Sequence, residues 1–240
     1  MTIRLAGLSV IITGGATGLG KVLAAELAGQ GANVLICGRR EDRLKDTMAE
    51  LGESASGELA YSVCDVRSKA DVQATVAKCA EVFGAVDVVI NNAGLTVPDL
   101  VEDCKEEDWD TVMETNVKGT FLMSQAALPS MKAKRSGVIL NIASQAAIRG
   151  YAQVASYSAS KHAILGFAEA LEKEVQEFGI RVHSLCPGLI QLPPPKHKEE
   201  LNPKILQVGD VVAAALYVLS QPPHVKINNI GLYNRFDPDV

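Results

Sequence analysis

Short apolar runs alternate along the chain with longer stretches in which apolar residues recur at helical spacing. The apolar runs lie at 10–12, 34–36, 59–64, 86–90, 138–142 and 180–185, and the helical stretches at 19–28, 43–51, 70–83, 107–132 and 156–178. The runs are continuously apolar, which is typical of strands that are covered on both faces. Regular strand–helix alternation predicts an α/β fold, a doubly wound parallel sheet with helices on both faces.

A proline-rich segment interrupts this pattern only late in the chain. Leu192-Pro193-Pro194-Pro195 excludes a helix and predicts a loop, and Gly209-Asp210-Val211-Val212 has the pattern of the next helix start. No repeat, linker or low-complexity block divides the 240 residues, of which 48% are hydrophobic. We therefore expect a single domain over 1–240, with a short substrate loop at about 189–208.

Charge and composition narrow the class of partner. The net charge is −5 and 21% of residues are charged, without the basic stripe expected for nucleic acid or an acidic membrane. The first apolar run is only of strand length and lacks the basic head of a signal peptide, and no run reaches the ~18 residues of a membrane span. We expect a cytoplasmic protein that binds a small molecule, with neither nucleic acid nor membrane as partner.

Cysteine and histidine usage gives no sign of a metal or disulfide framework. The cysteines stand singly, without a Cys-x-x-Cys pair, at Cys37, Cys64, Cys79, Cys104 and Cys186. This scatter predicts reduced thiols, and a catalytic cysteine is the alternative, although no motif surrounds any of them. No carboxylate–histidine spacing suggests a metal site.

A glycine-rich turn follows the first predicted strand. It reads Thr13-Gly14-Gly15-Ala16-Thr17-Gly18-Leu19-Gly20 and leads directly into a helix. Such a turn lets backbone amides and the helix N-terminus approach a pyrophosphate. The spacing departs from the common Gly-x-Gly-x-x-Gly fingerprint, so an ordinary glycine turn is the alternative; its place after the first strand favours a dinucleotide site.

The end of the second predicted strand indicates which dinucleotide binds. It reads Cys37-Gly38-Arg39-Arg40, and no acidic residue precedes Glu41. An acid here would bind the 2′-hydroxyl of NAD, whereas a guanidinium can pair with the 2′-phosphate of NADP. We therefore expect NADP, with NAD less favoured, while both arginines as solvated side chains remain the alternative.

Polar residues that could take part in binding or catalysis lie at later strand ends and helix starts. Asn91-Asn92-Ala93-Gly94 ends the fourth strand, Ser144 follows the fifth, and Asn116 lies in the helical stretch between them. Tyr157 and Lys161 are four residues apart, which places them on one face of a helix. An ammonium beside a phenol favours the phenolate and would bring its pKa, normally near 10, toward the range of a general acid–base.

These motifs, in this order, resemble the short-chain dehydrogenases/reductases, in the compact branch of the family. The resemblance runs from Thr13 through Pro187-Gly188 and implies a Rossmann sheet of about seven strands that transfers hydride between NAD(P) and an alcohol or carbonyl. It implies that Tyr157 acts as general acid in reduction and that Ser144 stabilises the carbonyl oxygen. Lys161 would bind the nicotinamide ribose and lower the pKa of Tyr157, and Asn116 would hold a water in the proton relay.

The same resemblance assigns cofactor contacts to three segments beyond the glycine turn and the arginines. They are Asp65-Val66 at the adenine ring, Asn92-Ala93-Gly94 along the adenosine ribose, and Pro187-Gly188 followed by Ile190, whose backbone would meet the nicotinamide carboxamide. One position departs from the family: Leu192 stands where a threonine often contacts the cofactor.

The sequence gives fewer indications of the substrate than of the cofactor. The tail from Gln221 to Asn228 resembles NADP-dependent 3-hydroxy-acid and serine dehydrogenases, and we expect a small polar substrate. Gln145, Ile148, Tyr151 and Gln153 are the expected pocket residues. Lys196, His197 and Lys198 could meet an acidic substrate, although a solvated charge run is the simpler interpretation.

Two other functions stay open, and an assembly is expected. The alternatives are a reductase of carrier-bound 3-oxoacyl chains and a non-catalytic NADP-binding regulator. The helix with Tyr157 carries a stripe of small residues, Ala155, Ala159, Ala163 and Gly166. Because the family commonly assembles through this helix, we expect a homodimer or homotetramer.

Overall fold

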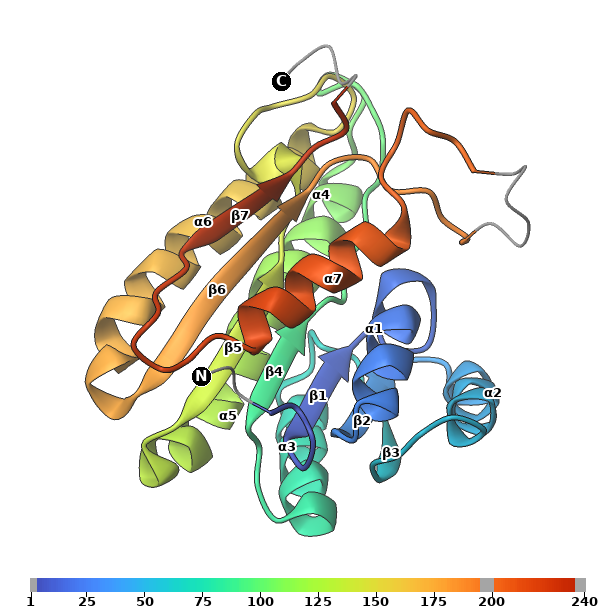
Figure 1. The fold of residues 1–240 in the computed structure, drawn as a ribbon. Coiled ribbons are helices and arrows are strands. Elements are labelled where there is room, and N and C mark those ends of the chain that lie inside the picture. The colour runs from blue at the N-terminus through green and yellow to red at the C-terminus, as the bar shows by residue number, and fades with distance from the viewer. Residues whose placement is uncertain (1–3, 195–200, 236–240) are drawn as a thin grey trace.

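In residues 4–194 and 201–235, which the computed structural model describes, seven strands form one parallel sheet (Figure 1). The strand order is β3-β2-β1-β4-β5-β6-β7, and every neighbouring pair is parallel. The strands are β1 (Ser9–Thr13), β2 (Asn33–Gly38), β3 (Leu59–Val63), β4 (Val88–Asn91), β5 (Gly137–Ile142), β6 (Ile180–Pro187) and β7 (Asn229–Leu232). This confirms the α/β, doubly wound parallel sheet.

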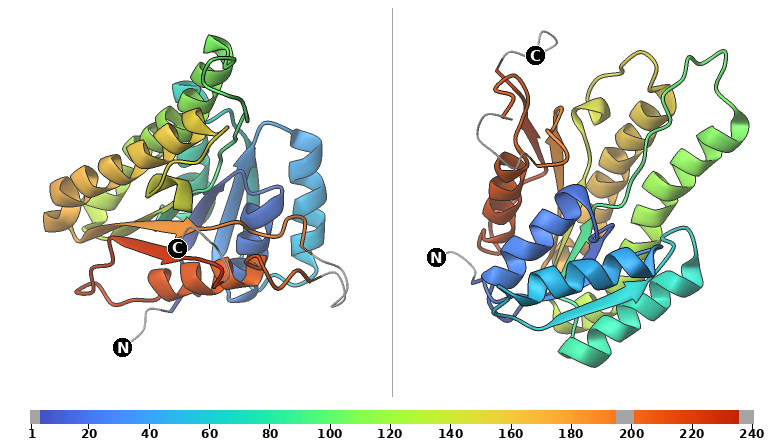
Figure 2. Two further views of the ribbon diagram at one scale, coloured as in Figure 1. Left: turned by 90° about the horizontal axis from the view of Figure 1, so that it is seen from above. Right: turned by 90° about the vertical axis from the view of Figure 1, so that its right-hand side faces the viewer.

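Helices cover both faces of the sheet (Figure 2). The helical elements are α1 (Gly18–Gly29), α2 (Glu41–Gly52), α3 (Lys69–Phe83), α4 (Glu106–Met113), η1 (Glu114–Lys118), α5 (Gly119–Lys134), η2 (Gln145–Ala147), α6 (Ala155–Val175), η3 (Gln176–Phe178) and α7 (Val208–Leu219). Apolar side chains of α1, α2 and α7 join one core cluster, and those of α3, α5 and α6 join the other.

The strands divide their side chains between these two cores. Ile12 and Ile36 point into the core beneath α1 and α7, whereas Ile11 and Leu35, their chain neighbours, point into the core beneath α3 and α5. All four are fully buried. Strands covered on both faces need apolar residues at successive positions, which accounts for the continuous apolar runs.

The expected helical stretch at 107–132 is divided in the structure. It forms α4, a π-helical turn at η1 and then α5, without a break in the backbone between them. A π turn inserts an extra residue into a helix and is found frequently at functional sites. Asn116 lies within this turn and is fully buried.

A crevice forms where the direction of strand progression reverses, between β1 and β4. From β1 the chain proceeds outward to β2 and β3, and then returns to place β4 on the other side of β1. The loops after adjacent strands therefore separate at this point, which is where ligands bind in doubly wound sheets. The glycine turn follows β1 here, and Asn92 follows β4.

Backbone hydrogen bonds join the two ends of the loop between β6 and α7. A parallel bridge pairs Ile190 with Leu206, through bonds from Gln191 N to Leu206 O and from Leu206 N to Leu189 O, at 2.8 and 2.9 Å. Helix α7 then starts at Val208 with a reciprocal capping box between Gln207 and Asp210, close to the expected start. Residues 195–200, with Lys196, His197 and Lys198, lie outside the described residues.

None of the helices that the structure describes is long and apolar enough to cross a membrane.

Candidate active site

The glycine turn is held open by contacts with two neighbouring strands. The amides of Gly14 and Gly15 donate to the carbonyl of Cys37 at the end of β2, at 2.8 and 3.3 Å. From β4, the side-chain amide of Asn92 donates to the carbonyls of Thr13 and Gly14, at 2.9 and 3.3 Å. These bonds fix the turn at the mouth of the crevice.

Glycine is required at particular positions of this turn. Gly14 and Gly18 have φ values of +65° and +55°, in the left-handed region that glycine adopts without strain. At Gly20 the constraint is packing, because a Cβ atom there would lie 2.5 Å from Asn92 Nδ2 and from Gly14 O. The turn therefore needs glycine for its conformation and for its approach to Asn92.

The N-terminus of α1 is available to an anion. Thr17 precedes the helix in an extended conformation, and no side-chain hydrogen bond caps the helix. The first amides of an uncapped helix carry partial positive charge and point outward along its axis. Backbone donors of this kind bind phosphate groups.

A smaller cavity, of about 220 Å³, lies beside this helix start. Its wall includes most of the expected adenosine-end residues, namely Gly14, Thr17, Arg39, Arg40, Asp65, Val66, Ala93 and Gly94. Both arginine side chains are exposed. A guanidinium pair at one end and helix amides at the other suit a ligand with two phosphate positions.

Asp65 is already engaged within this cavity. Its carboxylate accepts hydrogen bonds from the Arg67 guanidinium, the shortest at 2.6 Å. Arg67 is also the main reason that the pKa of Asp65 lies below its usual value, with a smaller contribution from Arg39. Any contact of this carboxylate with an adenine ring is therefore shared with Arg67.

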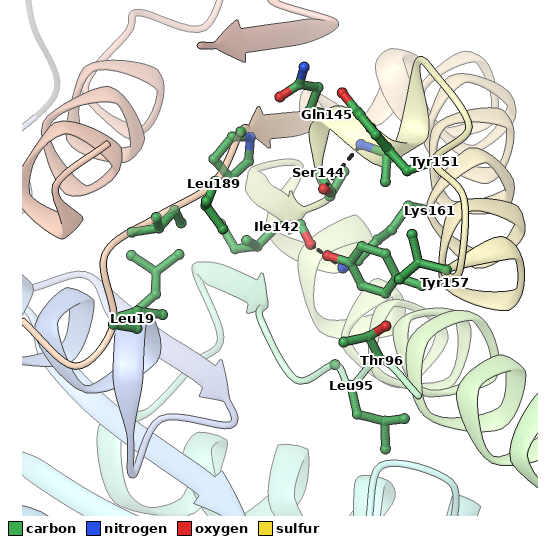
Figure 3. A pocket seen from close by; sticks show the side chains of 18 of the residues that line it. Leu19, Leu95, Thr96, Ile142, Ser144, Gln145, Tyr151, Tyr157, Lys161 and Leu189 are labelled. Carbon is green, nitrogen blue, oxygen red and sulfur yellow. Dashed lines mark hydrogen bonds between the residues drawn. The ribbon is translucent and has the colours of Figure 1, made fainter. Parts of the chain in front are cut away.

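A larger cavity, of about 630 Å³, is shown in Figure 3. It adjoins the smaller one, because Gly94 and Leu95 lie in the walls of both. Its wall brings together Ser144, Tyr157 and Lys161. The expected cofactor residues on it are Leu19, Asn92, Gly94, Pro187, Gly188 and Ile190. Gly18, Gly20 and Asn116 line neither cavity, since the glycines form the turn itself and Asn116 is buried behind Gly94.

Three short elements position the polar groups of the larger cavity. Ser144 lies two residues after the end of β5 and accepts a hydrogen bond from Ala146 N at 3.1 Å, which caps η2. Tyr157 and Lys161 lie in the first two turns of α6, on the face toward the cavity. Lys161 Nζ donates to the carbonyl oxygen of Ile142 at 2.8 Å, and this bond ties the ammonium to β5.

Burial is the main cause of the pKa shifts of Tyr157 and Lys161. It raises the pKa of Tyr157 above its usual value, and the hydrogen bond with Ser144 only partly opposes this. Burial also lowers the pKa of Lys161 to about 8. The lowering of the Tyr157 pKa that we expected from Lys161 is absent, because the ammonium lies 5.5 Å from the centre of the tyrosine ring and is bound to Ile142. Tyr157 is thus a phenol at neutral pH.

Asn116 connects the π turn to the strand-end loop. Its side-chain oxygen accepts from Leu95 N, and its nitrogen donates to Leu95 O and to Ser160 Oγ, all at 2.9 Å. A Cβ atom on Gly94 would lie 3.3 Å from Asn116 Oδ1 and 3.6 Å from Lys161 Nζ. Gly94 thus permits the close approach of Asn116 and Lys161.

Sequence reasoning missed several residues of the site, Thr13 and Leu95 among them, and wrongly expected two others on the cavity wall. Thr13 Oγ1 accepts from the amides of Asn92 and Ala93, at 3.0 and 2.9 Å, and its only sequence signal is a hydroxyl at the end of the first strand. Leu95, whose signal is its position after the Asn-Asn-Ala-Gly motif, joins the two cavities. Gln145 and Tyr151 line the larger cavity as expected, but Ile148 and Gln153 do not.

No group of three or more histidine, cysteine or acidic side chains that could hold a metal occurs in the part of the chain that the structure describes.

Comparison with known proteins identifies the family of the chain. The family model described as short chain dehydrogenase matches residues 9–202. An uncharacterized oxidoreductase of Staphylococcus saprophyticus is 35% identical over 220 residues, which are 92% of this chain and 94% of the relative. One from Staphylococcus haemolyticus is 34% identical over 227 residues, 95% of this chain and 97% of the relative.

Solved structures give the same result. Levodione reductase superposes with a TM-score of 0.87 at 28% identity, covering 96% of this chain and 98% of the other. An alcohol dehydrogenase from the archaeon Thermococcus sibiricus, complexed with 5-hydroxy-NADP, superposes with a TM-score of 0.86 at 27% identity, covering 95% and 97%.

Proposed function

The chain belongs to the short-chain dehydrogenase family and is an NAD(P)-dependent oxidoreductase, and from this premise we propose that it interconverts a ketone or aldehyde and its alcohol with NADP(H). The observation that carries the proposal is the convergence of Ser144, Tyr157 and Lys161 on one cavity that adjoins the arginine-lined one. We propose that residues 1–240 act as one nucleotide-binding domain.

The described residues fit a dinucleotide across both cavities. Arg39 and Arg40 would hold the 2′-phosphate, and the uncapped start of α1 at Thr17 would hold the pyrophosphate. The Ile190–Leu206 bridge uses the amide and carbonyl groups of neighbouring residues, so the Ile190 amide and carbonyl are available to a carboxamide. NADPH, when bound, supplies a hydride to a carbonyl carbon.

The catalytic groups of the chain act on the carbonyl oxygen. Ser144 binds and orients this oxygen, and Tyr157 gives it a proton, which its raised pKa keeps available at neutral pH. Lys161 binds the nicotinamide ribose with the N–H groups of its ammonium that do not donate to Ile142 O. Asn116 holds the strand-end loop at Leu95 and, as a proposal, carries the relay by which Tyr157 regains its proton.

The preference for NADP rests on the charge at the end of β2. Within the wall of the smaller cavity, the 2′-phosphate end has two arginines and one carboxylate, Asp65, which Arg67 neutralises. A 2′-phosphate therefore meets net positive charge, whereas an NAD-type site presents an acid to the ribose. The complex of the Thermococcus sibiricus enzyme with 5-hydroxy-NADP supports the same choice.

Assembly and location complete the proposal. We propose a homodimer or homotetramer, because α4, α5 and the loop before them leave Val101, Trp109 and Phe121 between 40% and 75% exposed. All five cysteines are free, which supports a cytoplasmic location.

The test is NADPH consumption with a panel of aldehydes, ketones and 3-oxo acids, repeated with NADH. The proposal predicts turnover of at least one carbonyl, with a higher kcat/KM for NADPH than for NADH. Tight NADPH binding with no turnover across the panel would instead support the non-catalytic regulator. Turnover confined to carrier-linked 3-oxoacyl chains would support the carrier-dependent reductase.

A further inference from the structure

The described wall of the larger cavity offers no free charge to a substrate. Among the described residues, Lys161 is the only charged side chain on its wall. Lys161 is 4% exposed, is bonded to the Ile142 carbonyl and lies beneath the expected ribose position. A carboxylate brought into the cavity would therefore lose its hydration without gaining an ion pair, which is costly.

Apolar side chains surround the reacting groups and remain exposed. Leu189 is 71% exposed and Leu192 is 46% exposed, and both lie on the cavity wall. Leu95, labelled in Figure 3, and Val154 add further apolar surface to the wall of the cavity. Covering such surface with an apolar ligand is favourable, because it removes apolar surface from water.

The remaining polar groups on the wall are neutral. Gln145 and Tyr151 lie above Ser144, and Thr96 lies beside Leu95 (Figure 3). Gly188 leaves room for the Gln145 side chain, because a Cβ atom on Gly188 would lie 2.7 Å from Gln145 Oε1. Amide and hydroxyl groups recognise neutral oxygen atoms of a ligand and do not neutralise a full charge.

From these features we propose that the substrate is a neutral, mainly apolar ketone or its secondary alcohol, rather than a 3-oxo or 3-hydroxy acid. The proposal rests on the proposed function. It replaces the small polar substrate expected from the sequence. In reduction, the carbonyl carbon gains a hydride from NADPH and the oxygen gains the Tyr157 proton, which leaves the alcohol and NADP⁺.

A matched substrate pair tests the charge of the substrate. Ethyl 3-oxobutanoate and 3-oxobutanoate carry the same ketone and differ by one negative charge, and cyclohexanone adds a cyclic ketone. We expect a kcat/KM with NADPH roughly 100-fold higher for the ester than for the acid, because the described wall offers the acid no free cation. An equal or higher value for the acid would overturn the proposal.

A pair of leucine variants tests the place of the substrate. Leu189→Arg puts a cation on the cavity wall, whereas Leu201→Arg puts one on a 43% exposed leucine of the same loop that does not line the cavity. We expect Leu189→Arg to raise kcat/KM for 3-oxobutanoate about tenfold and to lower that for the ester, with Leu201→Arg unchanged. Equal effects of the two variants would contradict the assignment of Leu189.

The outcomes separate this inference from the proposed function. Turnover of ketones with a preference for the acid overturns the substrate class and leaves the reductase intact. No turnover of any carbonyl, with NADPH bound, overturns the proposed function and this inference with it.

Discussion

At the scale of single residues, Lys161 is a cation in an environment that disfavours its charge. It is buried, it donates one hydrogen bond to Ile142 O, and burial lowers its pKa to about 8. Its remaining N–H groups face the larger cavity. A ligand that accepts those bonds would relieve the cost of burial, so the site is prepared for ribose hydroxyl groups.

The first prediction concerns the pH dependence of stability in the free enzyme. Between pH 8 and about 10.5 native Lys161 has lost its proton while the unfolded chain keeps it, so the Lys161 contribution to the free energy of unfolding rises with pH. Urea unfolding should show wild type gaining up to roughly 3 kcal/mol relative to Lys161→Met across this range. Lys173→Met, an exposed position of the same helix, is the control, and parallel pH curves for wild type and Lys161→Met would contradict the prediction.

The second prediction concerns coenzyme choice. Arg39→Ala should weaken NADPH binding about 10- to 100-fold, because a charge-assisted bond to phosphate contributes about 1.5–3 kcal/mol, and should leave NADH binding unchanged. Isothermal titration calorimetry with both coenzymes measures this. Arg43→Ala, which changes an exposed arginine outside both cavities, is the control. Equal weakening of both coenzymes would refute the assignment of Arg39.

At the scale of elements, the β1–α1 turn depends on contacts that come from β4. Gly20 faces Asn92, and Asn92 in turn binds the carbonyls of Thr13 and Gly14. The glycine spacing predicted a phosphate-binding turn before α1, and α1 begins there. It could not predict the partner of the turn, because Asn92 lies more than 70 residues further along the chain.

The third prediction tests that packing. Gly20→Ala should destabilise the fold by about 1–3 kcal/mol and weaken NADPH binding, since its Cβ atom would overlap Asn92 and Gly14. Gly29→Ala, in the same helix with open space around it, should be neutral or stabilising by up to about 1 kcal/mol. Thermal unfolding of both variants measures these changes in stability. Equal losses of stability would show that the helix backbone, and not the contact with Asn92, requires glycine at position 20.

The π turn shows the limit of sequence patterns for elements. The stretch at 107–132 has one continuous helical period, and the structure inserts η1 within it. The insertion is set by Asn116, whose side chain bonds both backbone groups of Leu95, and by Ser160 of α6. These hydrogen bonds join η1, the loop after β4 and α6, and they override the helical periodicity of the sequence. The sequence could therefore predict the helix but not its π turn.

At the scale of the whole molecule, the sheet followed from the sequence, whereas the cavity wall did not. Continuous apolar runs and glycine at a strand end are local signals, and they predicted the parallel sheet and the turn between β1 and α1. The larger cavity joins Leu19, Leu95, Tyr151 and Leu189 from four distant segments. Its apolar character depends on which side chains meet there, and on this ground we propose an apolar substrate in place of the polar one expected from the sequence.

The fourth prediction concerns assembly. Light scattering at working concentration should give about two or four times the chain mass of 25.5 kDa, because Val101, Trp109 and Phe121 form exposed apolar surface around α4 and α5. Trp109→Glu should shift the mass toward the monomer, while Tyr217→Glu, on exposed α7 surface, should not. A monomeric wild type would refute the assembly and leave the active site untouched.

The central claim is that Tyr157 gives its proton to a carbonyl oxygen held by Ser144. The most direct measurement is kcat for NADPH-dependent reduction of ethyl 3-oxobutanoate by wild type and Tyr157→Phe, with NADPH binding measured on both. The account predicts a fall in kcat of about 10²- to 10⁴-fold with the Kd for NADPH nearly unchanged. Retention of kcat within a few-fold in Tyr157→Phe would contradict it.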